Sequence, residues 1–166
     1  MARTFPTIQF QPTSMLPASS NGAAFVAHTT TPRSALAFDD STNESAIAAA
    51  ILPIEYLGTG TLKAKLFFYS ASANSGDAGW NVQVEAVTPG DTLDLEAAHS
   101  FDTANNGTQA LSGVAGNLTD ITISLSYKDS CAAGDLIRLA IQRDADSSDT
   151  VSGDLYLTLV ELFEEA

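Results

Sequence analysis

GDLIRLAIQRDADSSDTVSGDLYLTLVE, residues 134–161 of a chain of 166 residues, is the stretch that decides the fold. Its two apolar runs, 136–141 and 155–162, are rich in Leu, Ile and Val, and the loop between them contains Asp, Ser, Thr and Gly. Such runs favour extended backbone, and such loop residues are typical of turns. The stretch therefore predicts two antiparallel strands of one sheet.

Three further runs, residues 61–70, 80–87 and 118–127, alternate between apolar and polar side chains. This period of two is the pattern of a strand that buries one face. Trp80, the only tryptophan, has apolar period-two neighbours, which predicts that it anchors the core rather than stacks on a ligand. The predicted buried positions of the other two runs are Leu62, Ala64, Leu66, Phe68, Ile121, Ile123, Leu125 and Tyr127.

Weaker patterns complete the predicted sheet structure. A strand is expected at 48–56, short β segments are expected at 7–11 and 23–28, and residues 94–103 fit either a short helix or a strand. Turns are expected at 57–60, 89–91 and 105–107, where Gly, Pro, Asn and Asp gather. Seven or eight strands without a repeating helical pattern predict an all-β fold, an antiparallel β-sandwich of the jelly-roll type.

Residues 1–45 differ from the rest of the chain in composition. They are rich in Ser, Thr, Asn and Ala and contain Pro6, Pro12, Pro17 and Pro32. Proline removes a backbone donor and fixes φ, which disfavours long helices and central strands. We therefore expect an extended N-terminal arm that lies against the domain or a neighbouring molecule, followed by one sandwich domain at 46–166. A mobile terminus is the alternative.

Net charge restricts the class of partner. The chain has 20 acidic and 7 basic residues, a formal net charge of −13 and a pI of about 4.1. This charge repels phosphate backbones and anionic lipids, so neither nucleic acid nor a membrane surface is expected as a partner. We expect no signal peptide and no transmembrane segment, because no apolar run approaches the roughly 18 residues that a membrane helix needs.

No motif for catalysis or for cofactor binding is present in the sequence. The only cysteine, Cys131, has no disulfide partner and no recognisable motif with the two histidines, His28 and His99, so we expect it to be structural or incidental. The carboxylates of Asp144, Asp146, Asp149 and Asp154 are oxygen ligands of the kind that calcium prefers, but their spacing favours a solvated acidic turn. We therefore predict no enzymatic activity and assign no catalytic, cofactor or metal residue.

Two arginines in the run 136–144 are expected to differ in role. Arg143 ends the apolar face and precedes the acidic loop, which predicts an ion pair with Asp144 or Asp149. Arg138 lies among small and polar neighbours, which fits either a subunit interface or an ordinary surface position.

The residue order of this C-terminal region resembles that of small β-sandwich proteins in the virions of tailed bacteriophages. The residues that carry the resemblance are Gly134, Asp135, Arg138, Leu139, Arg143, Asp144, Asp149, Thr150, Gly153 and Asp154, together with the Gly–Trp strand at 76–87. The resemblance covers roughly residues 46–166. It implies a jelly-roll virion protein that is often trimeric, either a capsid decoration protein or a module of a head or tail fibre, and it implies no catalytic residues.

The expected function is that of a capsid decoration protein made in the bacterial cytoplasm, which binds the major capsid protein in the virion as a homotrimer. The alternatives are a head or tail fibre, and a carbohydrate-binding module that contacts host-surface glycans through the aromatic side chains of Phe67, Tyr69 and Tyr156. Apolar residues on both faces of 155–163 support self-association, because a sandwich buries only one face of each sheet in its own core. The N-terminal arm is the other candidate to cover such a face.

Overall fold

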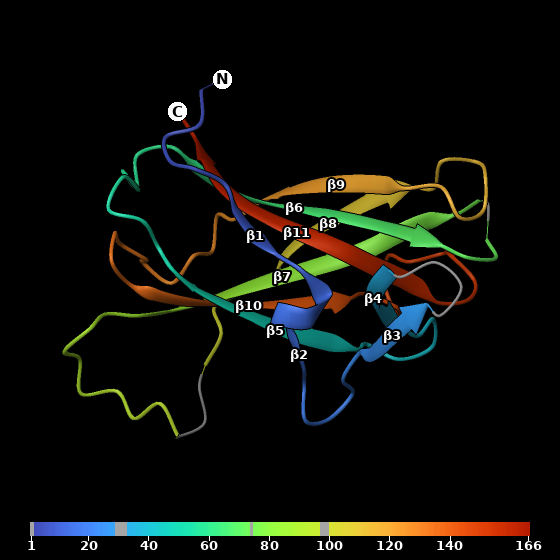
Figure 1. Cartoon of the computed structure of the whole chain (residues 1–166), viewed down its shortest axis with the longest axis horizontal. Helices are drawn as coiled ribbons and strands as arrows, with labels where there is room; N and C mark the ends of the chain where they lie inside the picture. Colours follow the sequence, from blue (N-terminus) through green and yellow to red (C-terminus); the bar gives the residue numbers. More distant parts are fainter. Residues whose placement is uncertain (1, 29–32, 74, 97–99) are drawn as a thin grey trace.

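The computed structural model describes residues 2–28, 33–73, 75–96 and 100–166. Its strands form two antiparallel sheets that pack face to face (Figure 1), and the described residues contain no α-helix. The predicted all-β sandwich is therefore confirmed. Trp80, Phe38 and Phe68 meet in the core, with ring centroids 5.1 Å apart for Phe38–Trp80 and 5.3 Å apart for Phe68–Trp80.

Six strands form the first sheet, in the order β3-β4-β11-β6-β9 with β1 also paired to β11. Both β1 and β4 lie along the edge of β11 that faces away from β6, β4 beside its first half and β1 beside its second half. The strands are β1 (Ile8–Phe10), β3 (Ala24–His28), β4 (Arg33–Phe38), β6 (Thr61–Ser70), β9 (Thr119–Ser124) and β11 (Leu155–Glu165).

Five strands form the second sheet, in the order β2-β5-β10-β7-β8. A short 3-10 helix, η1 (Pro12–Ser14), connects β1 of the first sheet to β2 of the second. The strands are β2 (Leu16–Pro17), β5 (Ser45–Ile51), β7 (Asp77–Val87), β8 (Asn105–Ala110) and β10 (Leu136–Arg143).

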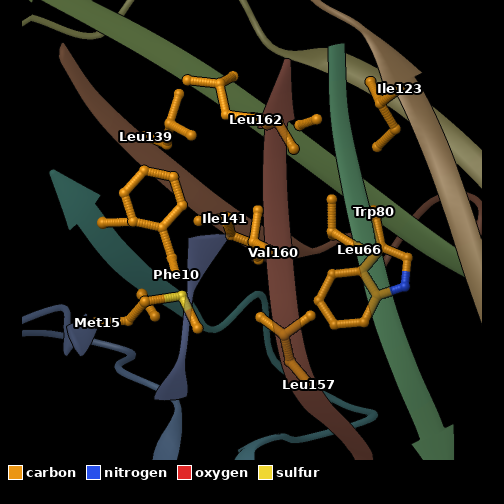
Figure 2. Close-up of a cluster of buried hydrophobic side chains, with 14 of the residues drawn as sticks. Phe10, Met15, Leu66, Trp80, Ile123, Leu139, Ile141, Leu157, Val160 and Leu162 are labelled. Carbon is orange, nitrogen blue, oxygen red and sulfur yellow. The ribbon is translucent and has the colours of Figure 1, made fainter. Parts of the chain in front are cut away.

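The apolar side chains between the sheets follow the predicted alternation. Figure 2 shows Leu66, Trp80, Leu139 and Leu157 directed from different strands into one cluster. Leu62, Ala64, Leu66 and Phe68 of β6 are fully buried, as the period of two predicts, and Ile121, Ile123 and Leu125 are buried with them. Tyr127, also predicted to be buried, is 52% exposed, because it lies beyond the end of β9 at Ser124.

The two runs of the stretch 134–161 lie in different sheets, so the prediction that they share one sheet is wrong. β10 belongs to the five-stranded sheet and β11 to the six-stranded sheet. Both strands bury alternate residues against the same core, so their sequence pattern is the same whether they pair or face each other.

A β-bulge exchanges the inward and outward faces partway along β11. Leu157 pairs with Phe68 and Leu159 with Phe67, so Thr158 is the extra residue, and its hydroxyl donates to the carbonyl of Phe67. Beyond the bulge, Val160 and Leu162 are buried with Leu157, whereas Leu159 turns outward. One inserted residue exchanges the two faces because successive side chains point to opposite sides.

Several predicted boundaries also change. The turn expected at 105–107 is the start of β8, because these polar residues pair with β7 at the sheet edge. β7 begins at Asp77 rather than at residue 80, and β5 ends at Ile51, before Pro53. β4 was not expected. The described part of 94–103 contains neither the helix nor the strand considered there, and its residues 97–99 lie outside the described residues.

Within residues 1–45, the described segments 2–28 and 33–45 are part of the sandwich rather than an arm beside it. The expected short β segments are present as β1 and β3, and β2 and β4 also pair into the sheets. Phe5, Phe10 and Met15 are each only 3% exposed and lie in the common core. Burial of these apolar side chains stabilises the segment. Its prolines, which have no backbone N–H to donate, are tolerated because these strands are short or lie at sheet edges.

Glu164 holds this N-terminal segment and the loop between β5 and β6 together. Its buried carboxylate accepts hydrogen bonds from the hydroxyl of Thr4 and from the backbone N–H groups of Leu57 and Gly60, the last two at 3.1 and 2.9 Å. Burial acts to raise the pKa of Glu164, but these hydrogen bonds to the charged form outweigh it and hold the pKa below its usual value.

One buried ion pair, Arg143–Asp149, connects the sheets. The guanidinium donates from Nε and Nη2 to the two carboxylate oxygens of Asp149, at 3.0 and 2.8 Å. Its other hydrogens bond the carbonyl oxygens of Phe38, Val151 and Gly153, so all five N–H groups of Arg143 are used. Arg143 ends β10 of one sheet, and Phe38 ends β4 of the other. The ion pair predicted for Arg143 is confirmed, with Asp149 as the partner.

Replacing Arg143 by Ala should lower the free energy of unfolding by about 3–5 kcal/mol, because Asp149 and three carbonyls then lose a buried donor. Urea unfolding measures this change. Arg3→Ala is the matched control: Arg3 is partly exposed beside Glu161, and loss of that pair should cost about 1 kcal/mol or less. Equal losses in the two variants would contradict the role given to Arg143.

Glu164 should make stability depend on acid pH. Because its folded pKa is lowered, its contribution is complete above the unfolded value near 4.5 and is lost as the pH falls through the folded pKa. Glu164→Gln should lose roughly 1–3 kcal/mol at pH 7 and show a shallower loss between pH 5 and pH 3. Thermal unfolding against pH tests this, with the exposed Glu55→Gln in the same loop as control; an unchanged acid slope in Glu164→Gln would refute it.

Candidate functional site

The acidic loop between β10 and β11 is bound to the protein itself. Asp149 accepts from Arg143 and also from the backbone N–H of Gly79 and Val151. Asp144 accepts from the hydroxyls of Ser147 and Ser148, at 2.6 and 2.9 Å. Among the residues that the structure describes, no group of three His, Cys, Asp or Glu side chains is placed to hold a metal ion. The loop therefore closes the end of the sandwich.

Cys131 is buried, and its thiol lies 3.5 Å from the hydroxyl of Tyr56, which also accepts from the ammonium of Lys128 at 3.0 Å. Burial raises the pKa of the Cys131 thiol, and a protonated thiol is a poor nucleophile. The predicted structural role agrees with these contacts. Of the two histidines, His99 lies outside the described residues, and His28 is placed only as a residue of β3.

The three aromatic residues predicted as a glycan platform share the outer face of the six-stranded sheet. Tyr69 of β6 and Tyr156 of β11 are direct cross-strand neighbours, and their rings stack with centroids 5.1 Å apart and an interplanar angle of 14°. Phe67 is partly covered by the ammonium of Lys65, 4.8 Å from its ring centroid. The structure thus brings Tyr69 and Tyr156 together, and all three rings are half-buried.

A groove of about 460 Å³ lies on the outer face of the other, five-stranded sheet. Most of its residues come from η1, β2, β5 and β10, and Figure 1 shows where these elements lie. We call it the sheet groove. Successive side chains of a strand point to opposite faces of the sheet. The residues next to the groove residues on β5 and β10 are core residues, so the groove residues themselves lie on the outer face. It is lined by Ser14, Leu16, Pro17, Ala18, Ser19, Ile47, Ala49 and Arg138.

The β-sheet register extends this groove into an amphipathic surface. Leu16 pairs with Ile47 and Ile47 with Ala140, so an apolar row crosses β2, β5 and β10. On the β7 side the outward residues are polar: Ala140 pairs with Gln83, and Arg138 with Glu85. In the next row Ser45, Gln142, Asn81 and Asn106 follow one another across β5, β10, β7 and β8.

Arg138 is held in place at the border between the apolar and the polar side. Its Nη1 donates to Oε2 of Glu85 at 2.8 Å, and its guanidinium lies 5.5 Å from the ring centroid of Phe101. From the sequence, Arg138 is expected either at a subunit interface or at an ordinary surface position. The structure places it in the lining of the sheet groove, with 27% of its side chain exposed.

The neighbouring amides are fixed by further hydrogen bonds. Gln83 Nε2 donates to the carbonyl of Asp102 at 3.1 Å, and Asn81 Nδ2 donates to Oε1 of Gln142 at 3.4 Å. Within the described residues, Oδ1 of Asn81 is buried without a hydrogen-bond partner. Donors and acceptors thus both lie beside an apolar floor, which suits a ligand with hydroxyl groups on apolar rings.

Sequence reasoning did not find this groove. The period of two in β7 and β10 shows that Gln83, Arg138 and Gln142 point outward, but Leu16 and Ile47, far from them in the sequence, join them only through strand pairing. Within the described residues no helix has the length and apolarity needed to cross a membrane.

Comparisons with known proteins identify the fold. No protein-family model and no curated protein matches the sequence. The module CBM6cm-2 of Cellvibrio mixtus lichenase 5A is similar with a TM-score of 0.54 and 10% identity, over 96% of this chain and 98% of that module. The CBM22-1 domain of Paenibacillus barcinonensis Xyn10C gives 0.53 and 11%, over 100% of this chain and 99% of that domain.

A third module, the C-terminal CBM6 of LamC from Zobellia galactanivorans, gives a TM-score of 0.50 at 13% identity over 96% of this chain and all of that module. The arabinofuranosidase MgGH51 gives 0.50 at 16%, and there the chain matches 90% of itself but spans only 23% of the enzyme. At such identities the likeness shows the fold alone: a β-sandwich of the kind found in carbohydrate-binding modules.

Proposed function

We propose that this chain is a non-catalytic carbohydrate-binding domain that holds a segment of a glycan in the sheet groove. The observation that carries the proposal is the placing of fixed polar side chains, Arg138, Gln83 and Gln142, beside an apolar strip of Leu16 and Ile47. Sugars have both characters, because their hydroxyl groups donate and accept hydrogen bonds while their ring C–H groups are apolar.

The polar side of this surface supplies the directional contacts. Within the described residues, Arg138 donates one hydrogen bond to Glu85, so its other N–H groups are available to hydroxyl oxygens. The amide N–H₂ of Gln142 and the carbonyl oxygen of Gln83 also make no hydrogen bond within this part of the chain. Since these side chains are already fixed by neighbours, binding costs less conformational entropy than it would for mobile groups.

The apolar strip supplies the contact area. Leu16 is 73% exposed, and Ile47 and Ala49 continue its surface across the sheet. The groove volume falls within the roughly 300–1,000 Å³ that is usual for small-ligand sites, enough for a few sugar units. Glu85, the carboxylate beside the groove, is bound to Arg138, which supports binding rather than acid–base chemistry.

Similar folds support this choice of ligand class. The Xyn10C domain is described as xylan-binding, and the CBM6cm-2 structure contains cellotriose. Because a shared fold does not establish a shared function, the proposal rests on the groove and takes the ligand class for the first experiments from these proteins.

Arg138→Ala and Gln142→Ala should each weaken glycan binding about five- to thirtyfold, since each removes a hydrogen bond worth roughly 1–2 kcal/mol. Isothermal titration with cellotriose and xylotriose, after a screen on immobilised polysaccharides, measures this. Tyr69→Ala on the opposite sheet is the control and should bind like the wild type. Loss of binding in Tyr69→Ala alone would move the site to the aromatic face, and no binding to any neutral glycan would refute the proposal.

A structural role in a tailed-phage virion is a second proposal, as a capsid decoration protein or a fibre component. Its support is the C-terminal residue order together with the half-buried aromatic side chains on the outer face of the six-stranded sheet. Phe5, Phe10 and Met15 of the N-terminal segment lie in the core, so these side chains do not cover that face. A second copy of the chain is then the proposed cover, in a homotrimer.

Native mass spectrometry at micromolar concentration tests the homotrimer. A trimer that Phe67→Glu disrupts is expected if the aromatic face is the interface, because a buried unpaired carboxylate is costly. Leu57→Glu is the control, since Leu57 is 64% exposed in the loop between β5 and β6. A monomeric wild-type chain would exclude the trimer and leave the glycan-binding proposal untouched.

A further inference from the structure

Arg138 is the positively charged residue in the lining of the sheet groove, and its guanidinium already pairs with the carboxylate of Glu85. Glu85 Oε2 lies 2.8 Å from Nη1 of Arg138, and the side chains of Arg138 and Glu85 are 27% and 4% exposed. The two residues are direct partners in the β7–β10 register, so the strand pairing itself fixes their approach. The positive charge is therefore compensated from the protein side, while no described residue other than Glu85 accepts a hydrogen bond from the remaining N–H groups.

Two more carboxylates are fixed near the same end of β7. Asp102 accepts from the backbone N–H of Asp129, and Asp129 accepts from the backbone N–H of Ala86, next to Glu85, at 2.9 and 2.8 Å. The backbone N–H of Asp102 in turn bonds the carbonyl of Val84. Glu85 is thus the carboxylate in contact with Arg138, and Asp102 and Asp129 are bound to the backbone close to Glu85 along β7, in a chain whose net charge is −13.

We propose that the sheet groove selects neutral glycans and rejects anionic ones, and that Glu85 sets this selectivity; the inference rests on the proposed function. A sugar carboxylate or sulfate placed at Arg138 would have to displace Glu85 or remain unpaired beside it. Either arrangement costs free energy, because a desolvated charge requires a partner and like charges repel. A hydroxyl group meets no such barrier. Rejection by a fixed like charge is a common route to specificity.

The experiment compares pairs of ligands with the same backbone. Cellotriose is set against its C6-carboxylated form, and xylotriose against its sulfated form, by isothermal titration. The wild type should bind the neutral member of a pair at least about tenfold more tightly. Raising the salt concentration should narrow this difference, because screening weakens the repulsion. This part needs no variant.

Glu85→Gln then tests the assignment to this residue. It keeps the shape and a hydrogen-bond acceptor for Arg138 but removes the competing charge, so the anionic ligand should gain at least about tenfold in affinity, while the neutral ligand changes less. Glu161→Gln is the matched control, because Glu161 also pairs with an arginine, Arg3, but on the six-stranded sheet. It should bind both ligands like the wild type.

The outcomes separate this inference from the proposed function. Equal wild-type affinity for the neutral and anionic members would overturn the selectivity and leave glycan binding in place. Wild-type discrimination that persists unchanged in a folded Glu85→Gln, checked by its melting temperature, would overturn the role of Glu85. Absence of binding to every neutral glycan would remove the proposed function itself.

Discussion

The sandwich depends on one buried ion pair, Arg143–Asp149. Burying two charges costs several kcal/mol, and the pair is tolerable only when the remaining hydrogen-bonding groups are satisfied. Here every N–H of Arg143 has an acceptor, and three of those acceptors are carbonyls of the chain that leads into or out of the six-stranded sheet. The interaction therefore fixes where β10 ends, how the loop turns, and how the chain enters β11 on the other sheet.

The residues that carry the resemblance to phage virion proteins are largely those of this connection. Arg143 and Asp149 form the ion pair, the carbonyl of Gly153 accepts from Arg143, and Thr150 accepts from the backbone N–H of Asp77 at the start of β7. Such a residue order reports how two sheets are joined, and it does not describe a binding surface. That is why one sandwich fold is compatible with a virion role and with glycan recognition, and why function has to be argued from the outer faces.

The two outer faces differ in chemistry. The face of the six-stranded sheet carries the stacked pair Tyr69–Tyr156, whereas the face of the five-stranded sheet carries a groove with an apolar and a polar side. Sequence alternation indicated the aromatic residues, because they lie in two apolar runs of the chain, 61–70 and 155–162. It did not indicate the groove, because Leu16, Ile47 and Arg138 come from three separate parts of the chain and meet through strand pairing.

The sequence by itself determined the all-β class, the buried faces of β6, β7 and β9, and the ion pair of Arg143, because each follows from local alternation or from residues close along the chain. Tertiary structure alone decided that β10 and β11 lie in different sheets, that the bulge at Thr158 exchanges the faces of β11, and that the proline-containing N-terminus enters the core. The physical reason is that alternation along the sequence indicates which side chains are buried. Which strand covers them depends on contacts between distant segments of the chain.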